Sequence, residues 1–218
     1  SLEVFCHDAE EIERAKQHSA LAGKLHTALH EVVGHASGQL EPGVGGPDAT
    51  LKSYASTLEE GRADLVALYY VMDPKLVELG VMPSLEVGKA EYDSYIRNGL
   101  LAQLRRIKLG KDVEEAHMRN RMWVSAWAYE NGKADSVIVK VERNGEIYYD
   151  IRDYDKLRTL FGELLREVQR IKSQGDYAAG QALVETYGVK VDPEVHKQVL
   201  ARAEKIKTAP YAGFIQPE

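Results

Sequence analysis

The sequence has 218 residues, of which 44% are hydrophobic and 28% are charged, a balance typical of a globular protein that buries a substantial core. Its net charge of −6 argues against nucleic acid as a partner, because nucleic-acid-binding domains usually carry a basic excess. No apolar run approaches the roughly 18 residues that cross a membrane, and no secretory signal is visible. A single cysteine, Cys6, excludes an internal disulfide and indicates a reducing compartment, the cytoplasm.

The chain predicts a mainly α fold. Asp8 is suited to cap the first helix, Ser84 the third and Asp112 the fourth, and the glycines and prolines of residues 41–50 indicate a loop. In chain order, helices are expected over residues 8–38, 51–72, 84–109, from 112 onward, and over 153–173, 176–187 and 192–207. Between the fourth and fifth helices, β-branched residues on both sides of Asn144-Gly145 predict one small β-hairpin near residues 136–151.

The first helix carries the run His30-Glu31-Val32-Val33-Gly34-His35. In the familiar zinc signature the two histidines are four residues apart, about 40° around a regular helix, whereas the spacing of five found here gives about 140°. A local widening of the helix that absorbs one residue, a π-bulge, would bring the two rings back together. Gly34 would tolerate this distortion. The motif therefore predicts a widened turn near Gly34.

A metal site on this helix needs a further ligand from another element, because a catalytic zinc has three protein ligands and one open position. Glu59-Glu60-Gly61-Arg62-Ala63-Asp64 on the next helix offers Glu59 or Glu60 as that ligand. Asp64 lies four residues after Glu60, on the same helix face. It could hold a ligand histidine through the other ring N–H, or it could simply pair with Arg62 or Lys52 at the surface.

These two motifs resemble those of the dipeptidyl peptidase III family, zinc exopeptidases that remove dipeptides from peptide N-termini. The family motifs, His-Glu-x-x-x-His and Glu-Glu-x-Arg-Ala-Glu/Asp, stand here as HEVVGH and EEGRAD. The resemblance implies that Glu31 activates water at the metal and that Glu59 and Asp64 support the ligands. The Zn²⁺ ligands that it implies are His30, His35 and Glu60.

The resemblance continues beyond the motifs. The AHMRNR run at 116–121 is similar to a family segment whose histidine stabilises the transition state and whose arginine contacts substrate; these residues correspond to His117 and Arg121. Residues 172–188 and Phe214-Ile215-Gln216-Pro217 also look like family stretches. Without the resemblance, His117 reads as an ordinary helix histidine and Arg121 as a solvated charge.

The sequence departs from the family pattern at several points. Gly61 replaces a usual cysteine, the linker between the motifs is shorter than in animal members, and Tyr211 and Ala212 replace a basic pair that holds the substrate's C-terminus. The family's N-terminal region, which forms the other lobe of the cleft and grips the substrate's amine, is missing. We therefore expect residues 1–218 to be a single α-helical zinc domain and a fragment of a longer protein, with a missing lobe or a fused domain, such as the Nudix hydrolase domain of some bacterial and plant relatives, as its partner.

The remaining candidates have simpler interpretations. Met122, Trp123 and Trp127 are expected in the core, and Cys6 is expected to be inert. The other histidines are expected at the surface or in packing: His7, His18, His26 and His196. Three functions then stay open: a zinc-dependent peptide hydrolase acting on a peptide substrate, a zinc-binding module without activity of its own, and a purely structural helical domain.

Overall fold

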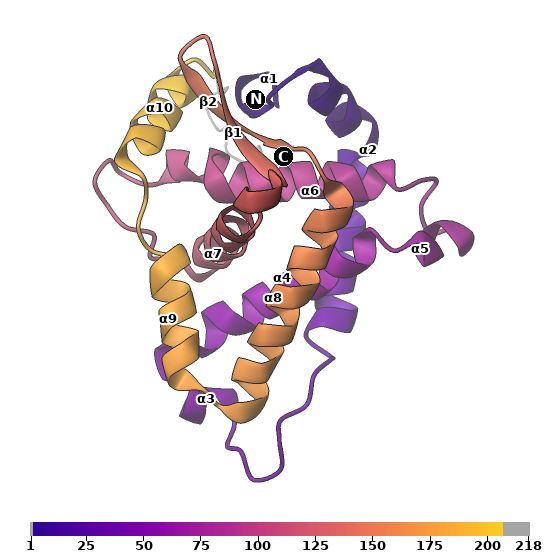
Figure 1. Cartoon of the computed structure of the whole chain (residues 1–218), viewed down its shortest axis with the longest axis vertical. Coiled ribbons are helices and arrows are strands. Elements are labelled where there is room, and N and C mark those ends of the chain that lie inside the picture. Colours follow the sequence, from indigo (N-terminus) through magenta and orange to yellow (C-terminus); the bar gives the residue numbers. More distant parts are fainter. Residues whose placement is uncertain (1, 207–218) are drawn as a thin grey trace, which may run out of the picture.

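The computed structural model describes residues 2–206, with side chains from Val4 onward. Within this range the fold is mainly helical, with one antiparallel sheet of two strands, as the sequence predicts (Figure 1). The α-helices are α1 (Leu2–Phe5), α2 (Ala9–Ala28), α3 (Pro47–Thr50), α4 (Ala55–Val71), α5 (Pro74–Glu78), α6 (Glu86–Leu100), α7 (Ala116–Asn131), α8 (Tyr154–Gln174), α9 (Tyr177–Tyr187) and α10 (Pro193–Glu204). The remaining elements are the π-helix η1 (Leu29–Gly34), the 3₁₀-helices η2 (Lys52–Tyr54), η3 (Ala102–Arg106) and η4 (Lys133–Asp135), and the strands β1 (Ile138–Arg143) and β2 (Glu146–Ile151).

Several predicted boundaries are confirmed and others are wrong. Asp8 caps α2 by accepting a hydrogen bond from the backbone N–H of Glu11. Asp112 does not cap the fourth helix, because its carboxylate pairs with Lys190, while Glu115 accepts the first free backbone N–H groups of α7. The third helix ends at Leu100, nine residues early, where the backbone tightens into η3. The predicted loop over 41–50 already contains α3.

Helix α4 forms the centre of the packing. Most of its side chains are buried, and it packs against η1, α7 and α8 (Figure 1). The principal core includes Leu65 and Leu68 of α4, Trp123 of α7 and Phe161 of α8, all fully buried. Burial of apolar surface is the main favourable term in folding, so this core fixes the position of α4 relative to its neighbours. The expectation that Trp123 lies in the core is confirmed.

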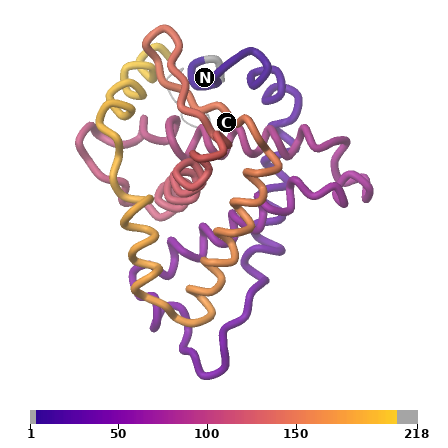
Figure 2. Tube along the Cα trace, viewed as in Figure 1, coloured from indigo at the N-terminus to yellow at the C-terminus, as the bar shows by residue number. Residues whose placement is uncertain are grey.

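The hairpin has the predicted turn. Ile138 pairs with Ile151 at the open end, and Asn144 and Gly145 at the tip have φ values of 53° and 75°, the left-handed conformation that Asn-Gly turns adopt. A second core joins β2 to η3 and α10 through Ile147, Leu104 and Val199. At the opposite end of the molecule, the segment between η1 and α3 forms an extended loop (Figure 2).

The structure also bears on two simpler predictions, that Cys6 is inert and that no segment crosses a membrane. The Cys6 thiol is buried, and burial raises its pKa to about 12, which keeps it protonated and unreactive at neutral pH. Among residues 2–206, no helix is both long and apolar enough to cross a bilayer. The predicted family stretch at residues 214–217 and the replaced basic pair, Tyr211 and Ala212, lie outside the described residues.

Candidate metal centre

The histidine motif, residues 30–35, lies on a widened helical turn. Residues Leu29–Gly34 form a π-helix, and the backbone N–H of His35 donates to the carbonyl of His30 at 3.0 Å, a bond that spans five residues. The extra residue in the turn rotates His35 back toward His30, and the two ring centroids lie 4.7 Å apart. The predicted widening is confirmed, and with it the convergence of the two rings.

Gly34 has a different role from the one predicted. Its φ is not positive, so the turn does not depend on the conformational freedom of glycine. A Cβ at this position would lie 2.9 Å from both Cα and Cβ of Ala63 on α4, closer than real carbon atoms approach. Gly34 is therefore required for the close contact between η1 and α4, and this contact places the histidines beside the second motif.

The side chain of Glu60 lies between the two histidines. Its carboxylate oxygens are 3.4 Å from His30 Nε2 and 3.8 Å from His35 Nε2, and one ligand atom from each residue fits within a 4.8 Å cluster. A tetrahedral zinc site with bonds of about 2.0–2.1 Å separates its ligand atoms by roughly 3.3–3.4 Å. Two imidazole nitrogens and one carboxylate oxygen are donors that zinc prefers, so the residues present fit this metal with little rearrangement.

Asp64 holds the far side of the His30 ring. Its Oδ1 lies 2.7 Å from His30 Nδ1, and the same carboxylate accepts hydrogen bonds from Tyr95 Oη at 2.7 Å and Asn120 Nδ2 at 3.0 Å. Burial opposes ionisation of Asp64, but its hydrogen bonds to His26 and His30 outweigh that effect and hold its pKa well below the usual range. The alternative of a surface pair with Arg62 or Lys52 is wrong, because Asp64 is buried.

Glu59 occupies the corresponding position behind His35. Its Oε1 lies 3.2 Å from His35 Nδ1, while Arg62 donates to both of its oxygens and Lys172 Nζ lies 2.7 Å from Oε2. Burial raises the pKa of Glu59, yet hydrogen bonds from Arg62 and Lys172 lower it overall to about 2. Arg62 also donates to the carbonyl of Gly34 at 2.7 Å, so it ties α4 to the widened turn.

The two predicted catalytic residues, Glu31 and His117, both have exposed side chains. Glu31 follows His30 directly on η1, and its side chain is exposed. The side chain of His117 is 61% exposed, and its Nδ1 lies 3.6 Å from Glu60 Oε2, beyond hydrogen-bond distance. His117 is therefore not held by packing, and its ring lies close to the Glu60 carboxylate of the cluster. Val32, which follows Glu31 on η1, is 71% exposed.

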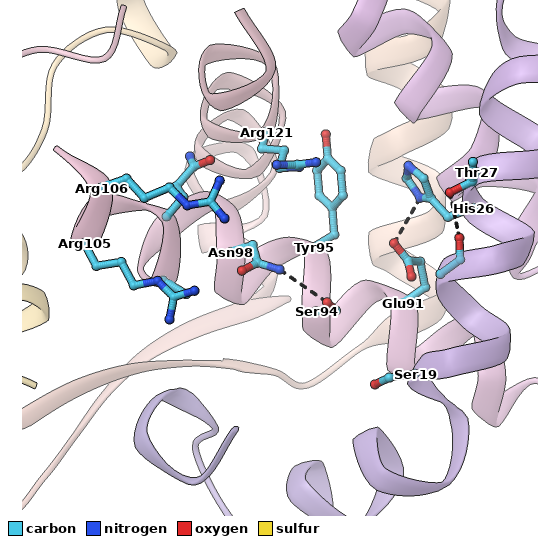
Figure 3. A pocket seen from close by; sticks show the side chains of 13 residues that line it. Ser19, His26, Thr27, Glu91, Ser94, Tyr95, Asn98, Arg105, Arg106 and Arg121 are labelled. Carbon is cyan, nitrogen blue, oxygen red and sulfur yellow. Dashed lines mark hydrogen bonds and ion pairs between the residues drawn. The ribbon is translucent and has the colours of Figure 1, made fainter. Parts of the chain in front are cut away.

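Arg121 lies one helical turn after His117 on α7, away from the metal ligands. It lines a cavity of about 320 Å³ that also contains Arg105 and Arg106 of η3 (Figure 3). In the described part of the chain, Arg121 forms no ion pair, and its guanidinium lies beside the ring of Tyr95 in Figure 3. The structure thus places Arg121 in this cavity, one helical turn beyond His117.

His26 was missed by the sequence interpretation, which placed it at the surface or in packing. It lies one helical turn before His30 on α2, with Nε2 at 3.0 Å from Asp64 Oδ1 and Nδ1 at 3.0 Å from Glu91 Oε1. Burial lowers the pKa of His26, but its hydrogen bond to Asp64 and its pairing with Glu91 outweigh that effect and raise it to about 10. The four-residue spacing from His30 was the only signal in the sequence that pointed to it.

The departure at Gly61 is compensated by packing. A Cβ at Gly61 would lie 1.9 Å from Trp123 Cζ2, so the indole of Trp123 occupies the space that any side chain at position 61 would need. The absence of the cysteine therefore leaves no gap beside Glu60. The indole of Trp123 on α7 thus packs directly against α4 at Gly61.

Comparison with known proteins gives a consistent result. Residues 46–218 match the sequence profile of Peptidase family M49, a range that includes Glu60 and begins after the histidine motif. The chain is 27% identical over 227 aligned residues to dipeptidyl peptidase 3 of Mus musculus and 27% identical over 226 to that of Homo sapiens, in both cases covering 84% of this chain. It spans 31% of the length of these curated relatives.

Solved structures share the fold. DPP III from Caldithrix abyssi aligns with a TM-score of 0.68 and 23% identity, covering 91% of this chain and 34% of that one. Dipeptidyl-peptidase III from Corallococcus sp. strain EGB gives the same TM-score with 20% identity, covering 94% of this chain and 34% of that one. At these identities the likeness concerns the fold, and it supports the helical architecture described above.

Proposed function

We propose that this chain, which belongs to peptidase family M49, carries the zinc-binding machinery of a peptidase that releases dipeptides from peptide N-termini. The observation that carries the proposal is the convergence of His30, His35 and Glu60 on a π-helical turn. Two curated relatives named dipeptidyl peptidase 3 supply the reaction class. Because the chain spans about a third of their length, the missing part of the cleft is proposed to come from another lobe or a fused domain.

In this proposal His30, His35 and Glu60 hold the zinc ion, and Asp64 and Glu59 hold the two histidine rings. A bound zinc ion would polarise the scissile carbonyl and lower the pKa of water beside it. Cobalt or manganese could occupy the same donors, since affinity order alone does not fix the metal. The cytoplasmic location stays a prediction that rests on the single cysteine.

The protein's own groups then move the proton. Glu31, exposed beside His30, accepts a proton from the attacking water on a carboxylate oxygen and delivers it to the leaving amine. His117 donates a hydrogen bond to the oxygen that becomes negative when the carbonyl is attacked. Arg121 contacts the peptide one helical turn further along α7.

A single substitution tests this assignment. Glu31→Gln keeps the shape of the side chain but removes the base, so turnover of a dipeptidyl-arylamide should fall by about 10²–10⁴-fold while zinc content is unchanged. Glu163→Gln, a change at another exposed glutamate on α8, serves as the matched control and should retain activity. Retained turnover in Glu31→Gln would refute the mechanism.

A second function is supported by the share of the curated relatives that the chain spans, 31% of their length, and by the exposure of Glu31 and His117. A zinc-binding module without independent hydrolysis would take up the metal but would not cleave the arylamide unless the parent protein supplies the other lobe. Assaying this chain beside the parent protein separates the two functions. A purely structural domain would bind no stoichiometric metal, which elemental analysis of protein purified without chelator would show.

A further inference from the structure

His26 lies at the end of a hydrogen-bonded chain that leads to a proposed metal ligand. It lies near the end of α2, four residues before His30 of η1, and its ring stacks on that of Tyr95, with centroids 5.9 Å apart. Figure 3 shows Glu91 reaching His26 from α6 and Tyr95 standing beside it. His26 is thus fixed from two helices and does not depend on α2 alone.

Four side chains form polar contacts with the carboxylate of Asp64. Oδ1 is shared by His30 Nδ1 at 2.7 Å and His26 Nε2 at 3.0 Å. Oδ2 accepts from Tyr95 Oη and Asn120 Nδ2. A buried carboxylate with every oxygen engaged has one orientation, and His26 determines where the oxygen that meets His30 lies.

His196 shows what a packing histidine looks like in the same molecule. It is 1% exposed, and its Nε2 lies 3.0 Å from the backbone carbonyl of Ile107, with no carboxylate paired to it among residues 4–206. His26, in contrast, lies between two buried carboxylates, those of Asp64 and Glu91, and one of them touches the metal cluster. Burying two carboxylates close together is unfavourable unless a shared partner forms polar contacts with both of them. The imidazole of His26 is that partner, so packing alone does not explain its position.

We propose that His26 is a positioning residue for the metal site. It holds Asp64 Oδ1 against His30 Nδ1, so that the His30 ring presents Nε2 to Glu60 and His35. Glu91 holds His26 in turn, which makes the sequence Glu91–His26–Asp64–His30 one continuous support. The proposal rests on the proposed zinc site, and groups that orient a ligand from behind typically change metal affinity by about 10–100-fold when they are removed.

The test measures zinc affinity by competition with a chromophoric chelator. His26→Leu should weaken zinc binding by about tenfold, whereas His26→Gln, whose amide can still donate toward Asp64, should recover most of the loss. His18→Leu, at another partly buried histidine of α2, is the matched control and should leave the affinity unchanged. Equal affinities of His26→Leu and the wild type would overturn the proposal.

A double substitution separates positioning from a general loss of structure. Because His26 acts through Asp64, adding His26→Leu to Asp64→Asn should cause no further loss of affinity, while independent roles would give additive losses. If the wild type binds no zinc, the proposed function fails, and the positioning role is read from the imidazole NMR signals of metal-free protein. The His30 Nδ1–H signal should then shift or broaden in His26→Leu but not in His18→Leu; an unchanged signal would refute positioning.

Discussion

The two histidines of the candidate metal site are held by carboxylates in different surroundings. Asp64 supports His30 from inside the helix bundle, with side chains of α2, α6 and α7 all directed at it. Glu59 supports His35 at a partly exposed edge, where Arg62 of its own helix and Lys172 of α8 neutralise it. The side chains of Asp64 and Glu59 are 7% and 25% exposed.

The difference indicates two ways to fix a metal ligand. The Asp64 side depends on packing, because its donors come from helices that meet only in the folded protein. The Glu59 side depends mainly on charge. The side chain of Arg62 is buried, but Lys172 and His35 are partly exposed, and there water and salt weaken electrostatic attraction. We therefore expect the two sides to respond differently to mutation, pH and salt.

The largest effect is expected from removing the buried carboxylate. Asp64→Ala leaves His26, Tyr95 and Asn120 without their shared acceptor, and breaking a buried charged pair typically costs about 3–5 kcal/mol of unfolding free energy. Urea denaturation of the metal-free protein measures this cost. Asp112→Ala, which removes a surface pair with Lys190, is the control and should stay within about 0.5 kcal/mol. A loss below 1 kcal/mol for Asp64→Ala would contradict the comparison.

A smaller effect is expected where both sides meet, at the contact of η1 with α4. Gly34→Ala places a methyl group against the Ala63 backbone, and overpacking of this kind costs about 1–3 kcal/mol. The displaced turn should also weaken zinc binding. Gly23→Ala on α2 is the matched control: its added Cβ meets nothing within 4 Å, so the change should stabilise the helix by about 0.5–1 kcal/mol. Thermal unfolding with and without zinc checks both.

The pH dependence should separate the two sides in opposite directions. The pKa of Glu59 is lowered from 4.5 to about 2, so its stabilisation is complete above pH 4.5 and is lost as pH falls toward 2. The pKa of His26 is raised from 6.5 to about 10, so its contribution is complete below pH 6.5 and is lost as pH rises toward 10.

Unfolding of metal-free variants measures both windows. The stability difference between wild type and Glu59→Gln should shrink under acid, and that between wild type and His26→Gln should shrink under alkali. A stability difference that stays constant over either pH range would show that the corresponding group, Glu59 or His26, does not have the shifted pKa.

The smallest effect is expected at Lys172. Its ion pair with Glu59 is partly exposed, and such pairs contribute about 0.2–1 kcal/mol. Lys172→Met should therefore lower stability only slightly, and the difference should decrease further in high salt. Arg62 retains its bonds to Glu59 and Gly34, so zinc affinity should change less than in His26→Leu. A loss of unfolding free energy comparable to that of Asp64→Ala would mean that the Glu59 side is held as tightly as the Asp64 side.

The sequence by itself determined the features that follow from local geometry. The angle between residues five apart on a helix requires the widened turn that η1 provides, and Asn144-Gly145 between β-branched runs requires the hairpin. The mainly α fold follows from the same periodic patterns. The end of α6 at Leu100 and the cap at Glu115 were not determined in this way, because several polar residues compete for the same free backbone groups.

Only the tertiary structure decided which side chains surround the cluster. The pairing of His26 with Asp64 and Glu91, the contact of Gly34 with Ala63 and the filling of the space at Gly61 by Trp123 join separate helices. Such contacts depend on how the buried faces of α2, α4, α6 and α7 pack together, and no local pattern specifies that packing. The motif supplies the proposed metal donors, while the packed core determines how firmly each is held.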